Sequence, residues 1–136
     1  MGCDSILSER ALREIYLKGF EIAIKEAQPM AIMTSYNKIN GIHAANNYDL
    51  CTNAARNEFG FMGMIMTDWT TTHNGPDCTA AGCMRAGNDV VMPGCENDQV
   101  NISTELASGS LKKADLEACV SRLVRCVLQS NEYVIG

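Results

Sequence analysis

One acidic residue stands where this sequence could carry out chemistry. Asp68 follows a short apolar run, Met64–Thr67, and precedes Trp69, the single tryptophan of the chain. Such a run is typical of a strand covered on both faces, as in a parallel sheet. A carboxylate at the carboxyl end of that strand lies where α/β barrels carry their catalytic residues. Asp68 is therefore a candidate catalytic carboxylate, and the alternative is that it caps the following turn, as aspartate often does.

The segments around Asp68 predict alternating helices and strands. Helical spacing of apolar residues and N-cap and C-cap signals predict helices at 8–28, from 47 or 49 to 59, at 80–86, at 100–106 and from 112 or 115 to 129. Apolar runs predict strands at 30–36, 64–67 and 88–94, and turn-rich loops at 37–41 and 70–76. Strands that alternate with helices predict an α/β fold with a parallel sheet. Three strands make a thin sheet with two open edges, so the sequence predicts part of a larger sheet.

Composition excludes several classes of protein. The 136 residues are 46% hydrophobic and 20% charged, as in a globular domain, and the net charge is −5. This charge argues against nucleic acid as a partner, because no basic stripe could neutralise phosphates. No apolar run reaches the roughly 18–20 residues that cross a bilayer, so no membrane partner is expected. The first residues also lack the pattern of a signal peptide.

Seven cysteines are many for this length, but their spacing predicts neither a disulfide framework nor a metal site. Cys78, Cys83 and Cys95 lie in a loop-rich stretch, yet they match no zinc template. The odd number favours free thiols in a reduced, cytosolic protein. His43 and His73 are interpreted as loop residues rather than ligands.

Three motifs in register carry a family resemblance. They read SYNKING at residues 35–41, EFGFMGMIMTDW at 58–69 and AGNDVVMPG at 86–94. From about Ser8 to about Gln129 the chain resembles glycoside hydrolase family 3, in its β-glucosidase and β-xylosidase branch. The resemblance implies a (β/α)8 TIM-type barrel followed by a second domain. A whole barrel needs roughly 250 residues. Residues 1–136 are therefore expected to form a single segment, which consists of the last three strand–helix units of the barrel with flanking helices. The first part of the barrel and the second domain are expected to lie outside it.

The resemblance also assigns roles. Asp68 would be the nucleophile of a retaining mechanism, in which a second carboxyl group about 5–5.5 Å away serves as acid and base. Tyr36 would lie beside the nucleophile, Met33 would line the sugar pocket, and Trp69 would stack on the sugar. The alternatives are a core methionine, a tyrosine at a strand end and a core tryptophan. Asp89, with the asparagine before it, is expected to serve a turn.

The implied function is hydrolysis of terminal β-linked glucose or xylose, with a β-linked oligosaccharide or glycoside as partner and no cofactor. In the family, the acid/base glutamate belongs to the second domain and most sugar-binding residues belong to earlier strands. The isolated chain is therefore expected to be inactive, and whether it is an enzyme by itself is left open. The alternative is a non-catalytic fragment that binds sugar or self-associates through exposed sheet edges.

Overall fold

The structure is a computed structural model that describes residues 2–73 and 76–130. Two short parallel strands form its centre. β2 (Ala31–Met33) pairs with β5 (Met64–Met66), in a register that sets Ala31 opposite Met64 and Met33 opposite Met66. Beyond β5, Val90 forms one parallel bridge with Met66. The α/β character and the parallel pairing predicted from the sequence are confirmed.

The predicted third strand at 88–94 is reduced to that single bridge. The Thr67 amide donates to the Val90 carbonyl at 2.9 Å, but the next donor, the Met92 amide, bonds the Thr67 side chain instead of a backbone carbonyl. Residue 93 is a proline and has no N–H to offer. The ladder therefore ends after one residue.

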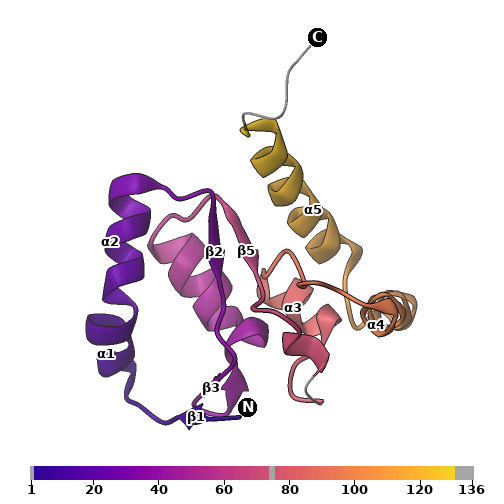
Figure 1. The fold of residues 1–136 in the computed structure, drawn as a ribbon, viewed down its shortest axis with the longest axis horizontal. Coiled ribbons are helices and arrows are strands. Elements are labelled where there is room, and N and C mark those ends of the chain that lie inside the picture. The colour runs from indigo at the N-terminus through magenta and orange to yellow at the C-terminus, as the bar shows by residue number, and fades with distance from the viewer. Residues whose placement is uncertain (1, 74–75, 131–136) are drawn as a thin grey trace.

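Helices surround these strands, as Figure 1 shows, with α2 on one side and α5 on the other. In chain order they are α1 (Glu9–Ala11), η1 (Leu12–Tyr16), α2 (Lys18–Ala27), η2 (Ala44–Asn46), η3 (Asp49–Glu58), η4 (Thr71–His73), α3 (Ala80–Ala86), α4 (Glu96–Ser108) and α5 (Lys113–Leu128). η1 and η3 are π-helical, whereas η2 and η4 are 3-10 turns. Each expected helix is present, although the first is divided into α1, η1 and α2.

The start and end of the first helical segment follow the sequence signals. The Ser8 hydroxyl accepts a hydrogen bond from the Ala11 amide at 3.2 Å, as expected of an N-cap. At the other end Gln28 adopts a left-handed conformation with φ 43°, directly before Pro29. Local chemistry therefore determines both boundaries.

A second sheet, made of three short strands, was not predicted. β1 (Asp4–Ser5) pairs in parallel with β3 (Lys38–Ile39), which pairs antiparallel with β4 (Ile42–His43). The prediction of a turn-rich loop at 37–41 was therefore wrong for residues 38–39, which form β3, and right for the turn at 40–41. Asn40 and Gly41, with φ 50° and 86°, form the two-residue turn of a hairpin, and Asn-Gly is the strongest short signal for that turn.

The hydrophobic core connects helices to β5. One cluster joins α2, η3, β5 and α3 through Ile24, Cys51, Ala55, Phe61, Ile65 and Ala86. A second cluster joins α3, α5 and the segment between α4 and α5. Its buried members are Ala81, Met84, Leu111 and Cys119. Burial raises the pKa of the Cys51 and Cys119 thiols to about 12, so both remain protonated and behave as small apolar residues.

Gly63 lies where two segments meet closely. A Cβ at this position would lie 2.4 Å from the Met30 carbonyl oxygen and 2.8 Å from the Phe61 ring. The Met64 amide donates to the same Met30 carbonyl at 3.0 Å. The absence of a side chain at residue 63 therefore allows β5 to begin beside β2.

A buried ionic cluster secures the amino end of the central strands. The Asp89 carboxylate accepts hydrogen bonds from Arg56 at 2.7 Å, from Arg122 at 2.7 Å and from the Ile65 amide at 2.8 Å. The Asp89 side chain is 0% exposed. Burial lowers the pKa of Arg56, and the Asp89 charge opposes that shift. The expectation that residue 89 serves a turn was wrong, because it connects η3, β5 and α5.

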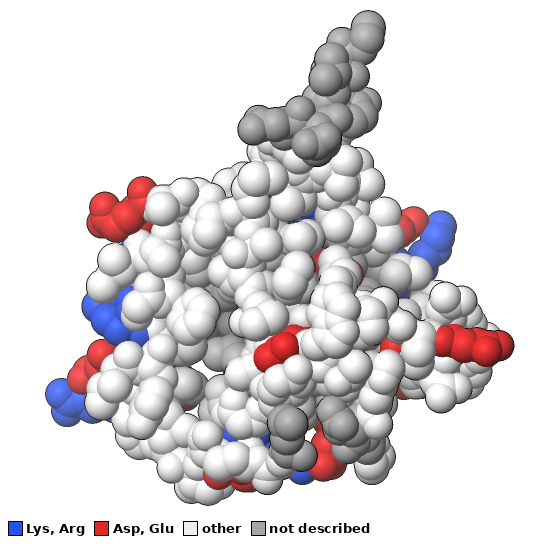
Figure 2. Space-filling model, viewed as in Figure 1, with Lys and Arg blue, Asp and Glu red and all other residues white. Residues whose placement is uncertain are grey.

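The surface of the face drawn in Figure 2 has most of its charged side chains near its margins, and much of its centre is uncharged. Within the ranges 2–73 and 76–130, none of the helices is long and apolar enough to cross a bilayer.

Candidate active site

Asp68 lies two residues beyond β5, at the carboxyl end of the central strands. Its side chain is partly exposed, and Oδ1 accepts a hydrogen bond from the Trp69 amide at 2.6 Å. The Asp68 carbonyl accepts from the Thr71 hydroxyl at 2.8 Å. The turn-capping role considered from the sequence is therefore present. This role leaves acceptor positions on the Asp68 carboxylate free for other contacts, because the two carboxylate oxygens offer about four lone-pair positions.

Tyr36 approaches Asp68 from the end of the neighbouring strand. Its hydroxyl donates to the Trp69 carbonyl at 2.8 Å. Burial raises the pKa of Tyr36, and hydrogen bonding to the Asp68 carboxylate and its charge raise it further. Tyr36 therefore remains a neutral hydroxyl beside Asp68. Parallel strands bring these two residues together because their carboxyl ends share one edge.

Trp69 is exposed although it is the single tryptophan. The residue is 55% exposed, while its amide and carbonyl are held by Asp68 and Tyr36. Core packing, the alternative considered from the sequence, is therefore not the role of this ring. An exposed indole on a fixed backbone is suited to stacking on an apolar or sugar face.

Met33 is also exposed, at 54%, so the core alternative does not apply to it. It lines an apolar hollow of about 530 Å³ between α2, η3 and β2, whose lining contains neither Asp68 nor Trp69. The structure therefore brings Asp68, Tyr36 and Trp69 together, whereas Met33 lies at the border of a separate hollow.

Three residues that were not predicted to belong to the site, Thr67, Thr70 and Met92, hold the loop after Asp68. The Thr67 hydroxyl accepts from the Met92 amide at 2.9 Å, and the Met92 carbonyl accepts from the Thr70 amide at 2.8 Å. Thr70 has a left-handed backbone with φ 59°. The Thr67–Met92 contact joins residues 25 positions apart, which no local pattern indicates.

A family model adds the deciding observation. The description "Glycosyl hydrolase family 3 N terminal domain" matches residues 3–126. The chain belongs to glycosyl hydrolase family 3. The α/β fold predicted as part of a TIM-type barrel is confirmed by the solved β-glucosidases that this family member resembles.

Relatives of this family 3 chain act on sugars, according to their names. It is 39% identical over 135 residues to a β-glucosidase from Ruminococcus albus, a match that covers 94% of the chain and 14% of the relative. It is also 39% identical to an exo-α-(1→6)-L-arabinopyranosidase from Bifidobacterium breve, covering 91% of the chain and 16% of the relative. The chain thus spans about one seventh of the length of these relatives.

Solved structures agree with this membership. A β-glucosidase from Paenibacillus barengoltzii superposes with a TM-score of 0.86 at 41% identity, covering 96% of the chain and 16% of that protein. β-Glucosidase 3B from Thermotoga neapolitana, solved in complex with glucose, gives a TM-score of 0.85 at 37% identity and covers 93% of the chain and 18% of that protein.

Proposed function

We propose that this chain supplies the nucleophile of a retaining β-glycosidase that hydrolyses terminal β-linked glucose or xylose. In this proposal it forms the C-terminal part of the family's barrel domain, and Asp68 is the nucleophile. The observation that carries the proposal is the grouping of Asp68, Tyr36 and Trp69 at the carboxyl ends of neighbouring parallel strands.

The chemistry follows from that grouping. An oxygen of ionised Asp68 attacks the anomeric carbon and forms a glycosyl ester, while the bond to the leaving oxygen breaks and that oxygen takes a proton from a second carboxyl group. Water then attacks the same carbon, loses its proton to that group and frees Asp68. The neutral Tyr36 hydroxyl, which donates to the Trp69 carbonyl in this structure, would redirect its proton to the nucleophile once the ester breaks.

Trp69 would define the sugar-binding side of the site. Its exposed ring, next to the nucleophile in sequence, offers a flat apolar surface for a pyranose. The relatives named above include enzymes for glucosides and for an arabinopyranoside, so the preference between glucose and xylose rests on residues outside this group. We place the acid/base carboxyl group outside the 136 residues as well, so the chain alone is expected to be inactive.

A chimaera tests the nucleophile. Residues 3–126 would replace the matching segment of the P. barengoltzii β-glucosidase, with Asp68 intact or changed to Gly. We expect the intact chimaera to hydrolyse an aryl β-glucoside and the Asp68→Gly form to lose that activity. Azide, a small nucleophile that fits the vacated space, should restore turnover and yield the α-glycosyl azide.

Covalent trapping gives an independent reading. A 2-deoxy-2-fluoro-glucoside with a good leaving group should label the peptide that contains Asp68, as detected by mass spectrometry. Asp115→Ala, which removes an acid from α5, is the matched control and should keep both activity and labelling. Labelling of another peptide, or full activity in Asp68→Gly, would refute the assignment.

Self-association of the isolated chain is the second candidate. Within the described part of the chain β2 pairs with β5 alone, so its outer edge is open, and apolar side chains are exposed on α2 and α5. Sedimentation at increasing concentration should show oligomers. A monomer at all concentrations would contradict it.

A further inference from the structure

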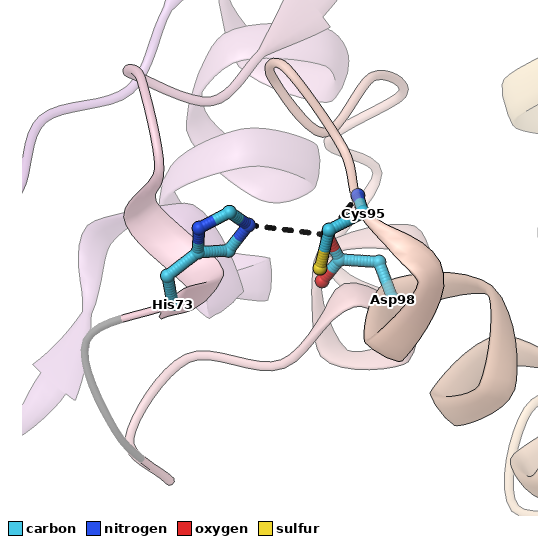
Figure 3. Close-up of side chains that lie close together, drawn as sticks. All are labelled: His73, Cys95 and Asp98. Carbon is cyan, nitrogen blue, oxygen red and sulfur yellow. Dashed lines mark hydrogen bonds and ion pairs between the residues drawn. The ribbon is translucent and has the colours of Figure 1, made fainter.

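Three potential metal ligands converge beside the loop that follows the nucleophile. His73 ends η4, Cys95 precedes the first turn of α4, and Asp98 is the third residue of that helix. Figure 3 shows the three side chains directed toward one another. Their ligand atoms, an imidazole nitrogen, a thiol sulfur and a carboxylate oxygen, all lie within 4.8 Å of one another.

The spacing suits one cation. Ligands at about 2.0–2.3 Å from a tetrahedral zinc ion lie about 3.3–3.8 Å from each other. His73 Nε2 and Asp98 Oδ2 are 3.7 Å apart, about 0.2 Å more than a nitrogen and an oxygen ligand of such an ion would be. This separation is too long for a hydrogen bond, so the two groups face each other without being bonded directly. The Cys95 sulfur would need to shift by at most roughly 1 Å to complete the set.

Hydrogen bonds at the start of α4 hold two of the three ligands, Cys95 and Asp98, in place. The Asp98 carboxylate accepts from the Cys95 amide at 2.9 Å, and the Cys95 side chain accepts from the Asp98 amide. This reciprocal pair is a capping box that fixes both side chains.

Asp98 is buried, whereas His73 is reachable from solvent. Asp98 is 8% exposed, and a buried carboxylate is normally paired or bound to a metal. The His73 side chain is 36% exposed, so a cation and a water molecule can reach the group from solvent. Three protein ligands with an open fourth position are a common arrangement for zinc.

We propose that His73, Cys95 and Asp98 bind a divalent transition cation of the zinc class, with water as the fourth ligand. Nitrogen and sulfur donors favour such a cation over magnesium or calcium, which prefer oxygen. On binding, the Cys95 thiol releases its proton to solvent and the thiolate coordinates the metal. The cation would join η4 to α4 and so fasten the loop that begins at Trp69.

The test measures binding of Zn²⁺ to the purified, reduced chain by competition with a chromogenic chelator, and of Co²⁺ by absorption. We expect one cation per chain and a thiolate-to-cobalt charge-transfer band. Serine is a good N-cap residue, and asparagine keeps a polar side chain at residue 73, so the Cys95→Ser and His73→Asn variants should both fold. Each should weaken binding by about tenfold or more, since loss of even an outer-sphere partner costs about that much, and Cys95→Ser should remove the band.

Matched controls separate this site from the other thiols and the other histidine. His43→Asn and Cys3→Ser should bind as the parent chain does. Cys78→Ser addresses a rival pair, because the Cys78 and Cys83 sulfurs lie 3.9 Å apart, and it too should leave binding unchanged.

Thermal unfolding provides a second readout. Zn²⁺ should raise the unfolding midpoint of the parent chain and leave that of the His73→Asn/Cys95→Ser double variant unchanged, because a ligand stabilises only the state that binds it. Equal Zn²⁺ affinity in the parent and the double variant would overturn the proposal, as would loss of the cobalt band in Cys78→Ser but not in Cys95→Ser.

Discussion

Two aspartates mark opposite ends of the central strands, and they differ in almost every respect. Asp89, at the amino end, has a side chain with no exposed surface, and it accepts hydrogen bonds from two arginines and a backbone amide. Asp68, at the carboxyl end, is partly exposed and accepts from one neighbouring amide, with a tyrosine hydroxyl beside it. One carboxylate is fully bonded, and the other is accessible.

The difference shows how one chain assigns stability and chemistry to the same residue type. A buried carboxylate bonded to two arginines and a backbone amide cannot approach a substrate, but its loss leaves two arginine charges without their partner. A carboxylate at the open edge can approach a substrate while contributing little to folding. Exchanging the two aspartates for asparagine in turn should therefore separate activity from stability.

The largest effect is expected at Asp68. In the chimaera, Asp68→Asn should lower kcat/KM for an aryl β-glucoside by about four orders of magnitude, the scale seen when a catalytic nucleophile is removed. Asparagine retains the oxygen that caps Trp69, so the urea midpoint should stay unchanged. A large loss of stability in this variant would show that the two aspartates share a structural role.

The second effect concerns Asp89. Asp89→Asn should lower the free energy of unfolding by about 3–5 kcal/mol, as expected when one partner of a buried ion pair is removed. Urea unfolding followed by circular dichroism would measure it, and Asp115→Asn on α5 serves as the control. A loss of unfolding free energy below about 1 kcal/mol would mean that the Asp89 ion pairs contribute no more than surface ion pairs do.

Tyr36→Phe sharpens the contrast at the open end. Loss of a hydroxyl that bonds a charged group costs about 1.5–3 kcal/mol, so kcat/KM in the chimaera should fall roughly 10- to 100-fold. An unchanged kcat/KM would place Tyr36 outside the mechanism.

The same residue gives a pH prediction. The pKa of Tyr36 is raised above its ordinary value of 10.0, so the stability contributed by its neutral form is present below pH 10.0 and is lost as the pH rises through the higher value. Ultraviolet titration of tyrosinate should assign the latest titration to Tyr36, and Asp68→Asn should shift it toward the ordinary value.

The smallest effect is expected at a surface arginine. Arg13 pairs with Glu9 and Glu58 at the surface, unlike Arg56 beside Asp89. Arg13→Ala should change the free energy of unfolding by at most about 1 kcal/mol, and added salt should reduce the difference further. Equal losses from Arg13→Ala and Arg56→Ala would contradict the distinction between exposed and buried pairs.

Local signals account for what the sequence could predict. The cap at Ser8, the helix end before Pro29 and the strand before Asp68 each depend on neighbouring residues, and each could be located in advance. Asn40-Gly41 was also a local signal, but the residues beside it were interpreted as a loop. The position of Asp68 at a strand end was predicted, and its tyrosine neighbour followed from the family resemblance.

Contacts between distant residues could not be predicted in this way. Asp89 is 33 positions from Arg56 and 33 from Arg122, and nothing in the spacing indicates that these three charges meet. The convergence of His73 with the start of α4 depends in the same way on how two loops cross. The third strand failed as a prediction because a side chain, Thr67, takes the donor that would have extended the ladder.

Gly63 has a consequence for how this sequence can vary. Because a Cβ there would lie 2.4 Å from the Met30 carbonyl oxygen, every other amino acid must push β2 and β5 apart at their first pair. Met62, immediately before it, is 62% exposed and can accept many side chains. A library that randomises both positions should therefore return almost any residue at 62 and only glycine at 63.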